Sequence, residues 1–512
     1  MNFRKKSWAL IFALALCAGS AFAQDQRQDT APIDPNAPLQ PLGATPAPNT
    51  APNQPATGGY ANPPIGAARG LDGPDDTLPN NLTQETPDTN TLAGAAAFTL
   101  GTPQHNRNIF DPSISVSQLG QTVPGPDGAA VLTGISVVGG SLNFDHTSGA
   151  VHFSMIYNGG ETFNLGYGAA PNYFIAVAPH YQFHDLAVTE EDIEGRWHLL
   201  LHDDFMASPG AAFTGQGMGG PGLISEFSGL LGTSLASFAQ AFLPSESINT
   251  GEVMRYRNSF LGQAEYSLSR RSTLTFSGTY GLLHFTQPGY VDSTLVGGQA
   301  GYDYQLDAAN SIAILGSYGR INFNGISTPT VDYMGAFAYG RKITGRLAFE
   351  VSAGPQEIHT TGIGNLGNFS LLFPSVNSSL KYQRRRAGIA INYMRGLTGG
   401  SGVFEGATSN TISAAFNYQF TRNWAGTVNA GYAINNSLAP AGVSSVQFDT
   451  WYFGANLGRR LGYWGKINFN YGALNQAIPA ICPVVSCGAS GLEETFGMSF
   501  NWHLVPISER RQ

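Results

Sequence analysis

Charged residues are scarce in this chain of 512 residues: only 12% are Asp, Glu, Lys or Arg, about half the usual share in a soluble globular domain. A large soluble β protein needs a charged surface to stay in solution. Beyond its first residues the chain also lacks an apolar run long enough for a spanning helix. A closed barrel with an apolar outside and a polar inside reconciles the two absences, because its strands pair all their backbone groups.

Cysteine is almost absent as well, with three residues in the whole chain. Cys17 lies in the N-terminal signal described below, which leaves Cys482 and Cys487. In an exported protein this close pair predicts a small loop disulfide. A redox or metal site would need closer spacing or further ligands.

Catalytic motifs are missing too. The sequence contains no G-x-S-x-G, no H-E-x-x-H and no P-loop. Asp203 and Asp204 follow His202, but neighbours along a strand point to opposite faces, so only one aspartate can join the histidine. We therefore predict no enzyme and no cofactor.

The N-terminus has the form of an export signal. Arg4, Lys5 and Lys6 precede the apolar stretch 10–16, and Ala21-Phe22-Ala23 is an A-x-A cleavage site. Residues 1–23 contain three of the 26 basic residues and no acidic one, which leaves 23 basic against 34 acidic residues. This acidity argues against nucleic acid as a partner.

Residues 24–110 are rich in proline, with 14 of the 30 prolines of the chain, and have no apolar periodicity. Such a composition cannot bury enough surface to offset the entropy of ordering. We predict a disordered periplasmic segment, which serves as a spacer or as a docking segment for the cell wall or a periplasmic partner.

Apolar residues alternate with small polar ones in 258–268 and again in 273–285. Period two in both stretches predicts two antiparallel strands that share one apolar face. The same pattern recurs from residue 111 onward and predicts strands at 113–121, 133–146, 150–157, 173–187, 196–206, 258–268, 273–285, 293–306, 311–322, 331–341, 346–358, 371–382, 387–395, 410–420, 423–435, 446–458, 464–472 and 494–503.

The connections between these strands alternate between short turns and long loops rich in Gly, Asn and Pro. In outer-membrane barrels the short turns are periplasmic. The fold class predicted for 111–512 is therefore an all-β antiparallel transmembrane β-barrel of 16–18 strands. Eighteen is favoured, because counting 113–121 puts both termini in the periplasm; sixteen is the alternative.

The polar face of these strands predicts the wall of a lumen. Its small polar residues suit water and neutral solutes, and charges of both signs give no strong ion selectivity. The predicted pore-lining residues are Thr273, Thr275, Ser277, Thr279, Glu265, Arg346 and Glu350.

The stretch 207–256 differs from the strands. It is glycine-rich at first, and then apolar residues recur at helical spacing within 221–243 until Pro244. We predict a short helix that plugs the lumen, lies on the rim or contacts a partner.

Histidines cluster in the predicted hairpin of 173–187 and 196–206. A turn centred on Glu191 sets His180 opposite His202 and His184 opposite His198, with His152 beside them. Opposed side chains on a sheet lie about 5 Å apart, and imidazoles suit Zn, Cu or Ni. The alternatives are a metal site and polar residues in a solvated wall.

Three stretches carry a family resemblance: GQAEYSLSRRSTLTFSGTYGLL, AYGRKITGRLAFEVSAGP and LTGGSGV. With the signal and the alternating strands, they resemble porin-like outer-membrane β-barrel proteins of Gram-negative bacteria with a Pro-rich N-terminal extension. The resemblance spans 113–503 and implies a fold, an outer-membrane location and the barrel-assembly machinery and membrane lipid as partners. One departure is that the last strand ends at Trp502 and is followed by HLVPISERRQ, whereas such barrels usually end on an aromatic residue.

The function predicted from these observations is a passive channel for small hydrophilic solutes. The alternatives are a conduit for polysaccharide export and a structural or adhesive barrel whose outer loops bind ligands.

Overall fold

The computed structural model describes seventeen stretches of the chain, which contain all the strands discussed below. These stretches are 108–124, 130–148, 151–164, 180–209, 254–269, 271–286, 290–307, 309–324, 329–344, 346–360, 368–384, 386–399, 404–421, 423–439, 445–462, 464–477 and 491–504. The predicted signal peptide, nearly all of the Pro-rich segment, the predicted helix at 221–243 and both Cys482 and Cys487 lie outside the described residues.

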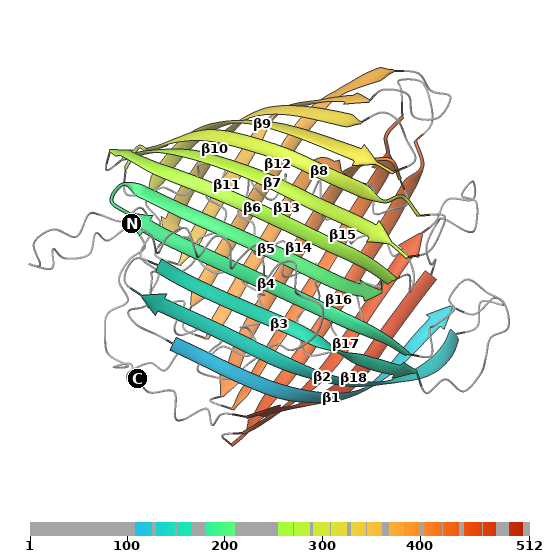
Figure 1. The fold of residues 1–512 in the computed structure, drawn as a ribbon. Helices are drawn as coiled ribbons and strands as arrows, with labels where there is room; N and C mark the ends of the chain where they lie inside the picture. Colours follow the sequence, from blue (N-terminus) through green and yellow to red (C-terminus); the bar gives the residue numbers. More distant parts are fainter. Residues whose placement is uncertain are drawn as a thin grey trace, which may run out of the picture.

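The described residues form eighteen strands in a single antiparallel sheet (Figure 1). The first nine are β1 (Asn108–Pro124), β2 (Ala130–Ser148), β3 (Val151–Asn164), β4 (His180–Glu194), β5 (Trp197–Pro209), β6 (Met254–Ser269), β7 (Ser272–Phe285), β8 (Ser293–Gln305) and β9 (Asn310–Phe323). The other nine are β10 (Thr330–Thr344), β11 (Leu347–Thr360), β12 (Phe369–Arg384), β13 (Ala387–Thr398), β14 (Ala407–Thr421), β15 (Trp424–Ser437), β16 (Gln447–Leu461), β17 (Gly465–Ala477) and β18 (Gly491–His503).

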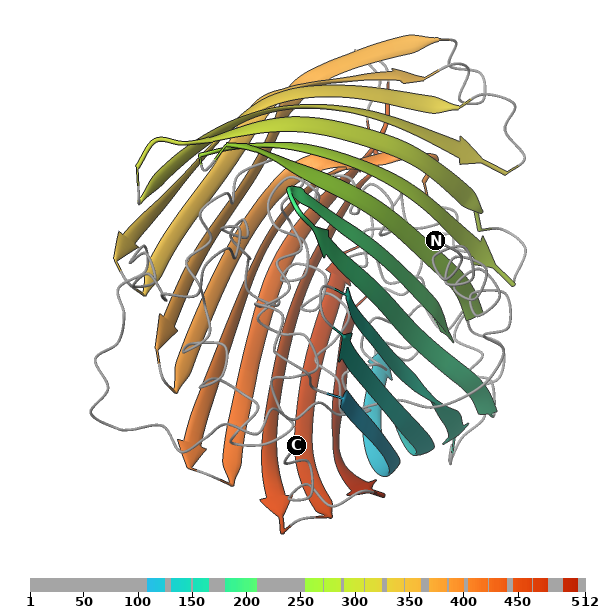
Figure 2. The ribbon, with the colours of Figure 1, turned by 60° about the vertical axis from the view of Figure 1, so that its left-hand side comes forward.

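The sheet closes on itself. Each strand pairs with its neighbours in sequence, and β1 pairs with β18 as well as with β2, for example through Ser117 opposite Ser499. Figure 2 shows the strands inclined around the wall. Closure leaves no free sheet edge, which a sheet in hydrocarbon requires. The prediction of eighteen antiparallel strands is confirmed, with the first strand starting at Asn108 rather than near residue 113.

The two ends of the barrel differ in the length of their connections. At one end, two to four residues join successive strands, as at 149–150 and 345–346. At the other end, five to forty-four residues do so, from 125–129 up to 210–253. β1 begins and β18 ends at the short-turn end, which is the periplasmic end in outer-membrane barrels.

The short turns use local chemistry to reverse the chain. Gly195, between β4 and β5, has φ 64°, a left-handed conformation that glycine adopts without strain. Between β8 and β9, Asp307 accepts hydrogen bonds from the backbone N–H of Ala309 at 2.7 Å and of Asn310 at 2.9 Å. The bond from Ala309, followed by the Asn310 side chain, holds the pKa of the Asp307 carboxyl below its ordinary value.

The outer face of the barrel is apolar. On β7, Phe276 is 50% exposed, whereas the adjacent Thr275 is fully buried on the other side of the sheet. Exposed aromatic and aliphatic side chains continue around the wall, including Val296, Ile314, Phe337, Ile412, Val428, Phe469 and Phe500. This arrangement is the reverse of a soluble protein and fits a wall surrounded by lipid. The chain is a transmembrane β-barrel of the outer-membrane type.

Exposed tyrosines and tryptophans lie near the strand ends. They include Tyr304, Trp451, Trp464 and Trp502. Rings at these positions suit the two membrane–water interfaces. Among the described residues no helix is long and apolar enough to cross a membrane.

Asp203 interrupts the apolar outer face. It is the seventh of the thirteen residues of β5 and shares the face of Leu199 and Phe205, which points toward lipid. The Asn258 amide nitrogen on β6 donates to its carboxyl oxygen at 3.1 Å. A carboxyl and an amide at mid-depth therefore share one hydrogen bond on the face that water does not reach.

Replacing both Asp203 and Asn258 with leucine is expected to raise the free energy of unfolding by about 1–3 kcal/mol, because two polar groups leave the lipid face together. Urea unfolding in lipid vesicles measures the change. Asp203→Leu alone should raise the free energy of unfolding by less, since it leaves the Asn258 amide without its partner. Loss of stability in the double variant would contradict lipid contact at this position.

Candidate functional site

The inner face of the barrel is polar and forms the candidate functional site. Its side chains alternate with the lipid-facing ones along every strand. Small hydroxyl and amide side chains dominate, including Thr273, Thr275, Gln299, Asn377, Ser379, Ser413, Asn417, Asn429, Asn468, Asn470 and Ser499. Such side chains bind solutes through hydrogen bonds and carry no charge.

One patch of this wall on β7–β9 has unsatisfied hydrogen-bonding groups. Within the described part of the chain, no protein group pairs with the Thr273, Thr275 and Thr279 hydroxyls, the Gln299 amide or the Ser317 hydroxyl. These residues lie on adjacent strands, with Gln299 opposite both Ser277 and Ser317. Buried polar groups that lack a protein partner need water. Within the described part of the chain, these groups therefore offer hydrogen bonds to water or to a solute.

A different part of the wall, on β4–β6, is charged. Toward the short-turn end, the His198 Nε2 atom lies 2.7 Å from Glu191 Oε1, and its Nδ1 atom lies 3.2 Å from Glu265 Oε2. Carboxylates only accept hydrogen bonds, so one imidazole serves both of them only when it is protonated. The three side chains come from three neighbouring strands and tie them together on the inner face.

Further along the same strands, Asp204 and Arg257 form a buried ion pair. The Arg257 Nη2 atom donates to both Asp204 carboxyl oxygens at 3.1 and 3.2 Å, and the Arg257 side chain is fully buried. Between this pair and the Glu191 cluster, His202 Nδ1 lies 2.9 Å from the Thr189 hydroxyl. Acidic and basic groups thus alternate along one wall.

The structure corrects the predicted pairing of β4 with β5. The chain turns at Gly195 rather than at Glu191, so that His202 lies opposite Thr189 and His198 opposite Ile193. The strand predicted at 173–187 is β4 (His180–Glu194), which ends seven residues later than predicted, and residues 173–179 lie outside the described residues. The turn was predicted too early because the acidic run 190–194 is charged, and charge indicates a turn. In the barrel, this run is part of a strand in the wall.

This shift separates the five histidines of the predicted metal site. His198 and His202 lie on the inner face, and the register places His152 opposite Glu191. His184 lies on the outer side, 2.7 Å from the Tyr157 hydroxyl, and the register places His180 opposite Phe163. In the described ranges, no group of three or more His, Cys, Asp or Glu side chains could hold a metal ion.

Most of the predicted pore-lining residues have the expected position. Thr273, Thr275, Ser277 and Thr279 on β7 and Glu265 on β6 face inward, and so does Glu350 on β11. Arg346 is an exception: it lies in the turn before β11 and is exposed. A basic residue there belongs to the periplasmic rim rather than to the wall.

Sequence reasoning missed the role of Glu191 and of Arg257. Arg255 and Arg257 alternate with Tyr256 and Asn258, so the period-two pattern of β6 already extends toward its N-terminal end. That alternation was the available signal. The ion pair with β5 could not be predicted in this way, because 44 residues separate β5 from β6 in the sequence.

No family model matches the chain, and no curated protein matches it. Solved outer-membrane proteins do resemble it in structure. OccAB3 of Acinetobacter baumannii has 10% identity and a TM-score of 0.38, and the match covers 77% of this chain and 99% of that chain. OccK2 (OpdF) of Pseudomonas aeruginosa in complex with glucuronate has 11% identity and a TM-score of 0.38, over 77% and 98%.

A BenF-like porin from Pseudomonas fluorescens Pf-5 has 9% identity and a TM-score of 0.39, over 77% of this chain and 99% of that chain. Likenesses this distant carry no argument about this protein. The fold rests on the strand register and on the reversed polarity of the two faces.

Proposed function

We propose that the barrel is a channel through which small hydrophilic solutes cross the outer membrane passively. The observation that carries the proposal is a closed wall of eighteen strands with a polar inner face. Barrels of eight strands fill their interior with side chains, whereas barrels of 16–18 strands leave an aqueous channel.

The β7–β9 patch supports the proposal because its hydroxyl and amide groups offer hydrogen bonds to water or to a solute. Thr273, Thr275, Ser277 and Thr279 are the residues we assign to the pore wall, together with Glu265 and Glu350. Uncharged hydrogen-bonding groups on most of the wall favour neutral polar solutes, such as sugars. The alternating charges on β4–β6 would orient a dipolar solute along one side. This function needs no catalytic group.

Planar lipid bilayers test the channel directly. Purified full-length protein should give stepwise openings at a fixed voltage, and vesicles that contain it should swell in isotonic sugar. Protein with the heat-modifiable gel mobility of a folded barrel that shows neither conductance nor swelling would overturn the proposal.

A matched pair of variants assigns the current to the lumen. Ser277→Trp adds bulk to the inner wall and should lower the single-channel conductance severalfold, whereas Phe276→Trp on the lipid face of the same strand should leave it unchanged. Equal conductance in the two variants would place the conducting path elsewhere.

A further inference from the structure

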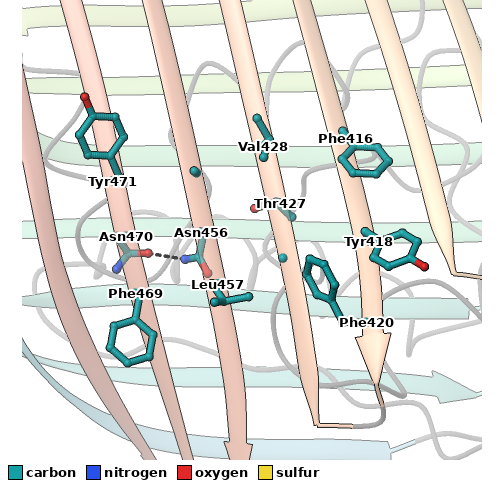
Figure 3. Close-up of a pocket in the computed structure, with 12 residues that line it drawn as sticks. Phe416, Tyr418, Phe420, Thr427, Val428, Asn456, Leu457, Phe469, Asn470 and Tyr471 are labelled. Atoms are coloured by element: carbon teal, nitrogen blue, oxygen red, sulfur yellow. Dashed lines mark hydrogen bonds between the residues drawn. The ribbon is translucent and has the colours of Figure 1, made fainter.

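A hollow of about 330 Å³ lies on the outer face of the barrel, across β14–β17. Aromatic rings from β14 lie on one side of it and rings from β17 on the other (Figure 3). Besides Val428, the larger outward side chains around it are Phe416, Tyr418, Phe420, Leu457, Phe469 and Tyr471. All six are more than a third exposed, so the hollow opens toward the membrane.

Two small residues form the floor of the hollow. Gly426 on β15 and Ala455 on β16 both face outward between the larger side chains. A Cβ atom added at Gly426 would lie 3.0 Å from the Phe420 ring and 3.2 Å from the Asn456 carbonyl oxygen. The Phe420 ring therefore packs over Gly426, and the small side chain of Ala455 leaves the space between the rings open.

A cation lies beside the hollow, toward the periplasmic end. One outward rung below the Gly426–Leu457 pair, Trp424 lies opposite Arg459. The Arg459 guanidinium carbon lies 5.2 Å from the centre of the Trp424 ring, and the Arg459 side chain is exposed. Among the described residues, no carboxylate forms an ion pair with Arg459.

We propose that this hollow is a glycerophospholipid site, in which one acyl chain fills the hollow and the phosphate binds Arg459. An unfilled hollow in the membrane would cost the dispersion contacts of every ring that borders it. An acyl chain has the right polarity, since the lining is almost wholly apolar. A phosphate has the right charge and depth, because Arg459 lies at the head-group level of the periplasmic leaflet and a guanidinium binds two phosphate oxygens at once.

The site differs from ordinary lipid contact in two respects. Here an acyl chain lies between rings of β14 on one side and rings of β17 on the other. The cation is also held in place, because Arg459 rests on Trp424 rather than extending freely into the head-group region. Chain and phosphate are therefore bound together, which selects a phospholipid over a free fatty chain.

Native mass spectrometry of the full-length protein tests the site, with palmitoyl-oleoyl phosphatidylglycerol as the probe. The unmodified protein should retain one lipid under detergent conditions that strip the others. Ala455→Phe, which fills the hollow, and Arg459→Gln, which removes the cation, should each lower that occupancy about tenfold. Ala300→Phe, at an outward position on β8 away from the hollow, should not change it.

Equal occupancy in all four proteins would mean annular lipid only and would overturn the proposal. A protein dimer that Ala455→Phe abolishes, without a retained lipid, would assign the hollow to a second copy instead. Diacylglycerol separates the two halves of the site: it should bind about tenfold more weakly than the phospholipid, and equal binding would overturn the role of Arg459. Heat-modifiable mobility confirms that every variant is folded.

Discussion

Replacing Arg257 with methionine should lower the free energy of unfolding by about 3–5 kcal/mol. Methionine keeps much of the side-chain volume but leaves the Asp204 carboxylate without the guanidinium that now contacts both of its oxygens. A buried charge that loses its partner costs more than the net contribution of the pair. Urea unfolding in lipid vesicles, followed by tryptophan fluorescence, measures the loss.

The double variant Arg257→Met with Asp204→Leu is the control. Removing both charges leaves no uncompensated group, so this variant should recover most of the stability lost by the single substitution. A double variant as unstable as the single one would show that packing around Arg257, rather than charge, stabilises this wall. The two variants thus distinguish an electrostatic role from a steric one.

The strands from β6 onward were predictable from the sequence. In β7 the alternation of Thr273, Thr275 and Ser277 with Leu274 and Phe276 identifies both the strand and its two faces. Each such strand carries its own signal, because the environment changes from water to lipid at every residue. The short turns then fix the register of each hairpin, and the strand count follows from adding hairpins.

The hairpin of β4 and β5 could not be predicted in the same way. Glu190, Glu191 and Asp192 are charged, and charge in a local window indicates a turn. In a barrel, however, the inner wall accepts charge, and Glu191 and Glu265 both contact His198 there. The better signal was Gly195, whose left-handed backbone reverses the chain.

The lipid-facing hollow had no signal in the sequence. Gly426 and Ala455 are ordinary small residues of two different strands, and neither predicts a site alone. The hollow arises because the register brings them together between rings of β14 and β17. A site built from four strands depends on three registers at once, and each register is a property of pairing rather than of any single stretch.

Phe337→Arg should destabilise the barrel by about 2–4 kcal/mol, whereas Ser317→Arg should cost far less. Phe337 is the eighth of the fifteen residues of β10 and is 52% exposed on the lipid face. A guanidinium at the middle of the bilayer loses its hydration, and the cost falls toward the interfaces. Urea unfolding in phospholipid vesicles gives both values.

Ser317 is the matched inner position for that comparison. It is the eighth of the fourteen residues of β9 and lies opposite Gln299 of β8 on the inner face, and its hydroxyl has no partner among the described residues. An arginine there stays hydrated if the lumen is aqueous, so its effect should fall on conductance rather than on stability. Equal destabilisation by the two arginines would mean that the interior is as dry as the membrane. That outcome would contradict the channel, whereas a difference of 2 kcal/mol or more supports an aqueous inner wall and a lipid-facing outer one.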